Sequence, residues 1–542
     1  MKNYKFIFYA LLITGVNMLA QSTEWAVSMG AGSADLGKSL VLDENGNTYV
    51  TGEFTGTVDF DPGPGVHNLI SQGDFEIFIL KLDLNGDFVW AKRIGGVNED
   101  KASSIAFDSF GDILITGSFK GTSDFDPGVN EFNLTSIGMM DSFIAKLDTG
   151  GNFIWAKQMG GSRWAIGDSI ITDIDSNIYS TGRFWETVDF NPSVDVYNLT
   201  SEGESDIYIS KLDRNGNFIW AKKIGSISWD VSTHMAIDNF GDVYVTGYFR
   251  GAPDFDPGTG VYNLTSVGIE DSFVLKLDSD GNFIWAKSIG GFQNDEAYGL
   301  TTDSDGNSYT IGYFTGAVDF NPGTGIYNLI SEGEIDIFIL KLDSNGEFVW
   351  AHSFGSSDYD FGSSIITNDF GNIYATGYFS GIIDFDPGTD VYNLTSIDEK
   401  DIFILKLDTS GNFNWAVNIG GSNIDFSTSI GVDNMDNVYT TGGFYGNIDF
   451  DPSVGTNTAT SAGLDDIFVL KTNQNPLEIQ YNLIANEVSI SPNPTNGLVN
   501  IDFGNLNKIN LRVFNANGKT VYYKNKISTK SYQFEIQGAS GV

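Results

Sequence analysis

Residues Trp90–Ile154 read WAKRIGGVNEDKASSIAFDSFGDILITGSFKGTSDFDPGVNEFNLTSIGMMDSFIAKLDTGGNFI, and this stretch is one unit of a repeat. The Trp-Ala dipeptide that opens the unit returns at a constant spacing of 65 residues. An unvarying period of this length indicates a repeat architecture. The tryptophans that mark the period are Trp25, Trp90, Trp155, Trp220, Trp285, Trp350 and Trp415.

Each unit has the pattern of short strands joined by hairpins. Runs rich in Ile, Val and Phe alternate with polar residues and are bounded by Gly, Asn and Asp, which is typical of strands and tight turns. In the quoted unit we expect four strands, around residues 104–108, 112–119, 141–147 and 152–158. Four antiparallel strands form one blade of a β-propeller, so the pattern predicts an all-β fold.

The two ends of the repeat region complement each other. The last unit stops at Lys471 and lacks the final strand that all other units have, whereas STEWAV, residues 22–27, supplies that strand at the start. An open solenoid would instead need polar caps at both ends. We therefore predict a closed seven-bladed β-propeller over residues 21–471, with the N-terminal strand completing the last blade.

Several of these motifs carry a family resemblance. GNIYATGYFSG, IDFDPG, DIFILKLD and SGNFNWAVNIGG, from the sixth and seventh units, resemble the bacterial seven-bladed β-propeller repeat, or SBBP repeat. The resemblance covers residues 22–471. That family is defined by its fold, so it implies no single activity.

The N-terminus has the pattern of an export signal. In residues 1–20, Lys2 and Lys5 precede an apolar run that ends at Ala20, as in a secretory signal peptide. Nothing later approaches the roughly 20 apolar residues of a membrane-spanning helix. The sequence contains no cysteine, which excludes disulfides, thiolate zinc sites and a cysteine nucleophile.

The negative charge is concentrated in the repeat region. The net charge is −41 for the whole chain; residues 21–471 hold 66 acidic and 21 basic residues (net −45), and residues 472–542 hold 4 and 6 (net +2). Such a surface repels nucleic acid and anionic lipid and attracts cations. We therefore expect a soluble acidic protein with no nucleic-acid partner.

The repeat ends after Lys471. Residues 472–486 read as a linker, and residues 487–542 read as a second module. Its blocks ISPNPTNGLVNIDF, LRVFNANGKTVYYKN and FEIQGASGV resemble the type A C-terminal sorting domain of the type IX secretion system. The resemblance implies a small immunoglobulin-like β-sandwich that directs export across the outer membrane of Bacteroidetes-type bacteria. Such domains continue beyond the point where this sequence stops, so we expect an incomplete domain here.

Catalytic motifs are missing from the sequence. The three histidines, His67, His234 and His352, fall at unrelated positions of the repeat. Serine-histidine triads and histidine zinc sites therefore have no support. We expect no catalytic residues and a non-enzymatic protein; the alternative is an extracellular enzyme that cleaves polysaccharide with paired carboxylates on the propeller loop face.

An Asp-Phe-Asp/Asn-Pro element occurs in all seven units. Proline cannot donate to a strand ladder and makes the preceding residue extended, so these carboxylates are expected to form turns. The alternative to a turn-forming role is calcium binding, because carboxylate oxygens are the preferred ligands of calcium. Calcium is the one cofactor that the sequence suggests. The candidate ligands are Asp59, Asp61, Asp124, Asp126, Asp254, Asp256, Asp384 and Asp386.

The third unit departs most from the repeat. The ninth residue after the Trp-Ala tryptophan is Trp164 in this unit and Trp229 in the next, and an Asp present in six units becomes Ala165. Exposed aromatic rings beside guanidinium groups can stack on a sugar or a peptide; packing between blades is the alternative. The candidate ligand-binding residues are Arg163, Trp164, Arg183, Trp185 and Trp229.

These observations lead to one functional expectation. The sequence favours a secreted or cell-surface propeller that serves as an adhesion or ligand-binding scaffold for a glycan or a surface protein. Its expected export partner is the type IX secretion machinery.

Overall fold

A computed structural model describes residues 21–453 and 455–473, together with five strands between residues 489 and 535. The chain divides into two compact units, of which the larger spans Gln21–Gln474. The described residues contain strands, turns and bends but no α-helix. Accordingly, no helix in the described part is long and apolar enough to cross a membrane.

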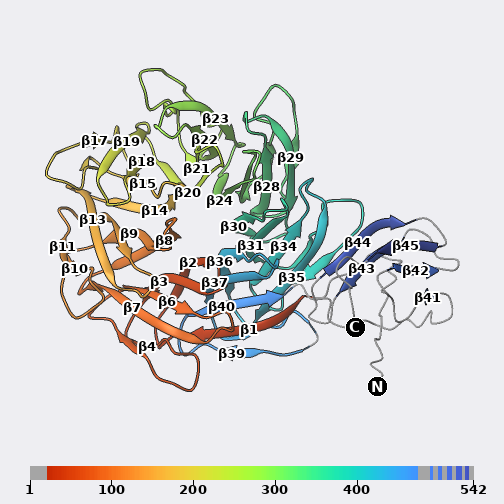
Figure 1. The fold of residues 1–542 in the computed structure, drawn as a ribbon. Helices are drawn as coiled ribbons and strands as arrows, with labels where there is room; N and C mark the ends of the chain where they lie inside the picture. The colour runs from red at the N-terminus through yellow and green to blue at the C-terminus, as the bar shows by residue number, and fades with distance from the viewer. Residues whose placement is uncertain are drawn as a thin grey trace. The chain divides into compact units, whose positions relative to one another are not determined.

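The larger unit is a ring of seven four-stranded antiparallel sheets, the blades. In blade 3, for example, the sheet order is β14-β15-β18-β19. We call the four strands of each blade A to D, from the inner strand to the outer one (Figure 1). The seven-bladed ring predicted from the 65-residue period is confirmed.

The strands are given in the order of blades 1 to 7. Strands A are β2 (Leu36–Leu42), β8 (Asp100–Phe107), β14 (Ala165–Thr172), β20 (Asp230–Ile237), β24 (Glu296–Thr302), β30 (Phe361–Thr367) and β36 (Asp425–Val432). Strands B are β3 (Thr48–Phe54), β9 (Ile113–Phe119), β15 (Ile178–Phe184), β21 (Val243–Phe249), β25 (Ser308–Phe314), β31 (Ile373–Phe379) and β37 (Val438–Phe444). Strands C are β6 (Glu76–Leu82), β12 (Asp141–Leu147), β18 (Asp206–Leu212), β22 (Asp271–Leu277), β28 (Asp336–Leu342), β34 (Asp401–Leu407) and β40 (Asp466–Asn473). Strands D are β7 (Phe88–Gly96), β13 (Phe153–Gly161), β19 (Phe218–Ile224), β23 (Phe283–Ile289), β29 (Phe348–Phe354), β35 (Phe413–Gly421) and β1 (Ser22–Met29).

The ring closes through the N-terminal strand. β1 pairs antiparallel with β40, with Trp25 opposite Lys471 and Met29 opposite Ile467. In Figure 1 the first strand of the propeller lies beside its last. The expectation that STEWAV completes the seventh blade is confirmed, and Trp25 is a structural residue.

The blade strands extend slightly beyond the expected ranges, and each unit has more pairing than expected. β8 begins at Asp100 and β13 continues to Gly161. Six units also form a short hairpin between strands B and C, which the sequence analysis missed because each arm has only three residues. These hairpins are β4 (Thr57–Asp59) with β5 (Asn68–Ile70), β10 (Thr122–Asp124) with β11 (Asn133–Thr135), β16 (Thr187–Asp189) with β17 (Asn198–Thr200), β26 (Ala317–Asp319) with β27 (Asn328–Ile330), β32 (Ile382–Asp384) with β33 (Asn393–Thr395), and β38 (Asn447–Asp449) with β39 (Thr458–Thr460).

Some hairpins latch onto the preceding blade. β10 pairs with β7 at Gly95 and Gly96, and a Cβ on Gly96 would lie 2.2 Å from the carbonyl oxygen of Thr122. Glycine is thus required where the hairpin backbone approaches the strand so closely. The equivalent residue after blade 5 is Ser356, and there β32 and β33 form a separate two-stranded sheet.

The core repeats as regularly as the sequence. One fully buried tyrosine occupies the same strand-B position in six blades, and its ring packs against the Trp-Ala tryptophan; Tyr49 lies 6.0 Å from Trp90 between ring centroids. Burying a large apolar side chain contributes about 1.5–3 kcal/mol, so seven equivalent cores stabilise the ring substantially.

A lysine on each strand C lies within this core, and it is buried in six of the seven blades. Lys276 is 3.3 Å from a carboxylate oxygen of Asp238 and 4.8 Å from the centroid of the Tyr244 ring. A buried ammonium needs such a partner because desolvation penalises the charge. Strand-C lysines form equivalent pairs with aspartates of the strand A to B turns in blades 2, 3 and 5, whereas Lys406 of blade 6 pairs with Asp436 in that turn of blade 7. Their role is therefore structural.

The smaller unit contributes five described strands. β41 (Ser489–Ser491), β42 (Leu498–Asp502) and β45 (Ser531–Glu535) form one sheet, and β43 (Ile509–Phe514) pairs with β44 (Thr520–Ile527). An immunoglobulin-like sandwich is not shown by these strands. The predicted signal peptide at 1–20 lies outside the described residues, as does most of the predicted linker at 472–486, whose first two residues belong to β40.

Candidate ligand-binding site

The antiparallel order of the blades places two kinds of connection on the same face of the ring. Links from strand D to the next strand A, and from strand B to strand C, emerge together, and we call this the loop face. Trp164 and Trp229 precede strands A of blades 3 and 4, and Trp185 follows strand B of blade 3. All three therefore belong to the loop face.

The three tryptophans form one aromatic cluster. The Trp185 ring lies between the other two, with centroids 5.4 Å from Trp164 and 5.9 Å from Trp229. Both contacts are edge-to-face, the arrangement favoured by aromatic quadrupoles. The central Trp185 is buried, Trp164 is half-buried and Trp229 is 42% exposed. The cluster thus has a buried centre and one ring open to solvent.

Charged groups lie at one end of the cluster. The guanidinium carbon of Arg163 is 5.2 Å from the Trp164 ring centroid. Arg163 Nε is also 3.8 Å from a carboxylate oxygen of Glu186, and both side chains are exposed. An exposed pair at this distance contributes little stability, about 0–1 kcal/mol at most. Both groups therefore keep free hydrogen-bonding capacity beside an aromatic surface.

Glu186 has a strained backbone that the sequence analysis missed. Its φ is +59°, in the left-handed region. Left-handed backbone costs a residue with a Cβ roughly 1–2 kcal/mol. The other six units have glycine at this position, all with positive φ: Gly56, Gly121, Gly251, Gly316, Gly381 and Gly446. Comparing the seven units residue by residue would have singled out Glu186, because glycine fills this position everywhere else.

The remaining sequence candidate, Arg183, belongs to a neighbouring ion pair. It lies on β15, and its guanidinium is 3.8 Å from the carboxylate of Asp168 on β14. Burial raises the pKa of Asp168 to about 6, and the nearby Arg183 opposes that shift. Four of the five candidates, Arg163 and the three tryptophans, therefore come together, and Arg183 sits beside this group on the same blade.

Ala165 stands where the other six blades have a buried aspartate. In blade 5 the equivalent Asp295 accepts the backbone N–H groups of Gly291 and Thr315, at 2.6 and 3.0 Å, and so joins the two loop-face connections. Blade 3 lacks this carboxylate. There the Trp185 N–H donates to the carbonyl of Trp164 at 3.0 Å, and the two rings pack together. The tryptophans therefore have a packing role as well as an exposed surface.

The calcium candidates act as turn-formers in the structure. One oxygen of Asp124 accepts the N–H groups of Asp126 and Phe132, and Asp126 accepts the N–H of Gly128. The pairs Asp59/Asp61, Asp254/Asp256 and Asp384/Asp386 make the same bonds, Asp61, Asp256 and Asp386 each capping the glycine two residues on. The four pairs lie in four different units and do not converge.

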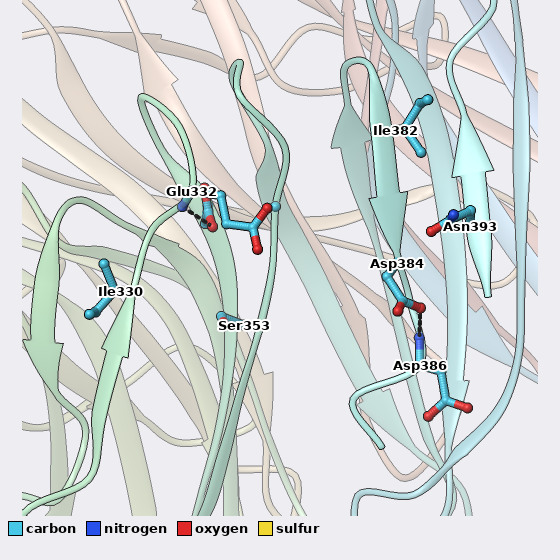
Figure 2. A pocket seen from close by; sticks show the side chains of 9 residues that line it. Ile330, Glu332, Ser353, Ile382, Asp384, Asp386 and Asn393 are labelled. Carbon is cyan, nitrogen blue, oxygen red and sulfur yellow. Dashed lines mark hydrogen bonds between the residues drawn. The ribbon is translucent and has the colours of Figure 1, made fainter. Parts of the chain in front are cut away.

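One of these pairs lines a cleft. Asp384 and Asp386 face a space of about 330 Å³ that also borders Glu332, between the hairpin of unit 6 and blade 5 (Figure 2). The cleft lies where Ser356 replaces the glycine that lets a hairpin latch. Within the described residues, no three acidic or histidine side chains are grouped so as to hold a metal ion. Calcium binding remains a prediction.

The histidines serve three separate packing sites. His234 is half-buried, and desolvation of its ring lowers its pKa to about 4. His352 stacks on Trp350 with centroids 4.8 Å apart, and His67 packs 4.9 Å from Phe88. The described structure thus does not bring any two of them into one site.

Two family models match the chain. A secretion system C-terminal sorting domain matches residues 489–540, and a β-propeller repeat of the SBBP type matches residues 89–123. The sorting domain marks proteins that the type IX secretion system exports to the cell surface or the extracellular space. The expected localisation is confirmed.

Curated relatives are distant and much longer. An uncharacterized WD repeat-containing protein of Acanthamoeba polyphaga mimivirus is 27% identical over 78% of this chain and 36% of its own length. Regulatory protein FlaEY of Caulobacter vibrioides is 24% identical over 53% of this chain and 30% of its own length. The chain therefore spans about a third of the relatives it matches.

Solved structures are also only distantly similar. Sqt1 of Chaetomium thermophilum has 10% identity and a TM-score of 0.39 over 83% of this chain and 99% of its own. A gluconolactonase of Xanthomonas campestris has 11% identity and a TM-score of 0.28 over 64% of this chain and 93% of its own. The chain is therefore a seven-bladed β-propeller in which residues 89–123 match the SBBP-type repeat, and residues 489–540 match the secretion system C-terminal sorting domain.

Proposed function

We propose that this exported propeller is a non-enzymatic binding protein whose loop face takes a glycan at the tryptophan cluster of blades 3 and 4. One observation carries the proposal above the others. Glu186 adopts a left-handed backbone beside Arg163 and Trp164, at a position where six units have glycine. Strain of this kind is tolerated where a side chain has a task that the fold itself does not require.

The chemistry of the cluster suits a sugar. The exposed Trp229 ring offers a flat apolar surface for the ring face of a saccharide. Arg163 supplies hydrogen-bond donors and Glu186 supplies acceptors, which are the groups that select hydroxyls. Binding sites commonly combine an aromatic lining with a few convergent polar groups in this way.

The proposal predicts a specific pattern of binding. The full-length exported protein would be screened on an array of neutral and acidic oligosaccharides, and hits would be titrated by calorimetry. We expect Trp229→Ala and Glu186→Gly to weaken binding roughly tenfold or more, as truncation of a central contact often does. The matched control is Ile424→Ala, which alters the Trp229 position in blade 7 and should change nothing.

Three results would overturn the proposal. Glycan binding that survives both cluster variants would place the site elsewhere. Capture of a peptide or protein with no glycan hit would change the ligand class. Turnover of a bound oligosaccharide, abolished by substitution of a loop-face carboxylate, would make the protein an enzyme.

A further inference from the structure

A second aromatic group lies on the loop-face half of blades 4 to 6. It comprises Tyr248 on β21, Tyr298 on β24, Tyr313 on β25, Phe361 on β30 and Tyr378 on β31, and we call it the aromatic arc. All five side chains are half-buried. Their inner strands β20, β24 and β30 follow one another around the centre of the ring (Figure 1). The arc therefore continues around the ring from the blade that carries Trp229.

The rings of the arc form a continuous chain of contacts. Phe361 and Tyr378 stack with centroids 5.2 Å apart and planes 6° from parallel. Phe361 also lies 4.6 Å from Tyr298, which lies 6.2 Å from Tyr313 and 6.5 Å from Tyr248. These contacts join three blades into one aromatic surface.

One buried carboxylate holds the hydroxyl ends of two arc tyrosines, and a second lies in an ion pair nearby. Glu296, 7% exposed, accepts a hydrogen bond from the Tyr298 hydroxyl at 2.6 Å and another from the Tyr313 hydroxyl. Glu270, 5% exposed, accepts from the Arg250 guanidinium at 2.7 Å. Because the hydroxyls of Tyr298 and Tyr313 are tied to Glu296, these two rings are held in place before any ligand arrives. Such preorganisation reduces the entropy lost on binding.

Ring symmetry argues that folding does not require these residues. Positions that pack the core stay apolar and buried in every blade, as Tyr49, its five tyrosine equivalents and Leu114 show. The strand-B position that is tyrosine in blades 4, 5 and 6 varies in the other blades. There it is occupied by Glu53, Ser118, Arg183 and Gly443. The ring therefore does not require tyrosine at this position, although the arc side chains do pack between blades 4, 5 and 6.

The arc adjoins the tryptophan cluster. Arg250, which holds Glu270, donates its backbone N–H to the carbonyl of Trp229 at 3.0 Å. At the other end, the Lys400 ammonium lies 4.4 Å from the centroid of the Tyr378 ring and so closes the arc. The backbone bond between Arg250 and Trp229 therefore links the arc to the tryptophan cluster within blade 4.

We propose that the aromatic arc is a second saccharide subsite and that the ligand is an extended, uncharged oligosaccharide lying across blades 3 to 6. The inference rests on the proposed function, because the tryptophan cluster supplies the first subsite. Extended aromatic surfaces suit a chain of sugar rings, each presenting an apolar face. Anionic chains are disfavoured, since Glu296 contacts the arc and residues 21–471 carry a net charge of −45.

The test varies the length of the oligosaccharide. Cello-, laminari-, manno- and xylo-oligosaccharides would each be titrated into the full-length protein as the disaccharide and as the hexasaccharide. For the linkage that binds, we expect the hexasaccharide to bind at least tenfold tighter than the disaccharide. Phe361→Ala should remove that gain and leave disaccharide affinity unchanged, whereas Trp229→Ala should weaken both.

Matched variants separate binding from folding. Phe426→Ala changes the same strand-A position in blade 7, outside the arc, and should preserve the full length dependence. Tyr313→Phe keeps a ring but removes one hydroxyl, so it should retain most of the gain if stacking is the main contribution. Thermal unfolding of every variant shows that the ring is intact.

The outcomes distinguish the two proposals. Equal affinity for disaccharide and hexasaccharide, or a gain that Phe361→Ala leaves untouched, would overturn the second subsite while the tryptophan site stands. Weakening of both ligands by Phe361→Ala would place the arc within the first subsite and overturn a separate one. Failure of every neutral series, with a peptide or protein bound instead, would overturn the glycan function and the arc proposal together.

Discussion

Blades 3 and 5 solve the same problem of joining their loop-face connections in different ways. Blade 5 uses the buried carboxylate of Asp295, which accepts two backbone N–H groups, and has a glycine at the left-handed position, Gly316. Blade 3 has Ala165, a tryptophan cluster and the strained Glu186. Because the blade forms with either arrangement, the difference between blades 3 and 5 points to a role other than folding.

The comparison also separates stability from binding. The carboxylate of blade 5 is hidden and can only hold the loops together. Blade 3 instead joins its loops by a backbone bond, and it exposes the charges of Arg163 and Glu186 beside the half-buried Trp164 ring. Substitutions in blade 5 should therefore change the free energy of unfolding, whereas Glu186→Gly in blade 3 should raise that free energy and weaken glycan binding.

The largest effect is expected from Asp295→Ala in blade 5. The change leaves two buried N–H groups without their acceptor, and each such loss costs about 1–3 kcal/mol. We expect the free energy of unfolding at pH 5 to fall by about 3 kcal/mol, measured by denaturant titration. Asp295→Asn, which keeps one acceptor oxygen, should fall less; equal losses for the two variants would contradict the role assigned to this carboxyl.

The second effect concerns pH. Burial raises the pKa of Asp295 to about 7, that of Asp230 to about 7 and that of Asp425 to about 8. The folded protein then holds protons that the unfolded chain has released above about pH 4. Stability should therefore fall as pH rises from about 4 through about 8.

Asp295→Ala gives blade 5 the residue that blade 3 has at Ala165, so this variant tests whether Asp295 causes part of the pH dependence. Asp295→Ala should flatten the decline in the free energy of unfolding between pH 5 and pH 8 by roughly 1–3 kcal/mol, since one pKa unit corresponds to about 1.4 kcal/mol. Parallel profiles for the variant and the parent protein would show that Asp295 does not titrate in this range.

A smaller loss of unfolding free energy is expected when blade 5 receives a glutamate at the left-handed position, as in blade 3. The nearest atom to a Cβ built on Gly316 is 3.5 Å away, so Gly316→Glu meets no steric obstacle. Its φ of +72° should nevertheless cost roughly 1–2 kcal/mol of unfolding free energy. Thermal and denaturant unfolding would measure this loss, and an unchanged stability would mean that the left-handed backbone at Glu186 stores no strain.

The smallest effect on stability is the reverse change, Glu186→Gly in blade 3. Relief of the left-handed backbone should raise the free energy of unfolding by up to about 1 kcal/mol, while glycan binding weakens. A stabilised variant that binds normally would remove Glu186 from the site and leave the tryptophans as its only support.

Most of the architecture was predictable because its signals are periodic. Seven tryptophans at one spacing indicate seven blades, and the strand missing after Lys471 but present at Ser22 indicates closure. The short hairpins were not predictable, because three-residue strands carry too little pattern. Their latching depends on single residues such as Gly96, whose importance appears only when the hairpin backbone is seen to lie against it.

The candidate site was predictable only in part. Trp164, Trp185, Trp229 and Arg163 stand out as departures from the repeat, and the structure brings them together. Glu186 was overlooked although the six glycines at its position were visible in the sequence. The aromatic arc was overlooked because Tyr298 and Phe361 belong to different units and meet only through the packing of blades 5 and 6.

The sequence by itself therefore determined the number of blades, the closing strand and the export module, since each depends on a local or periodic pattern. The tertiary structure decided which of the non-recurring side chains become neighbours. The physical reason is that residues about one unit apart come into contact only when the closed ring packs one blade against the next. Contacts of that kind carry the proposed binding surface, and the repeat pattern alone does not contain them.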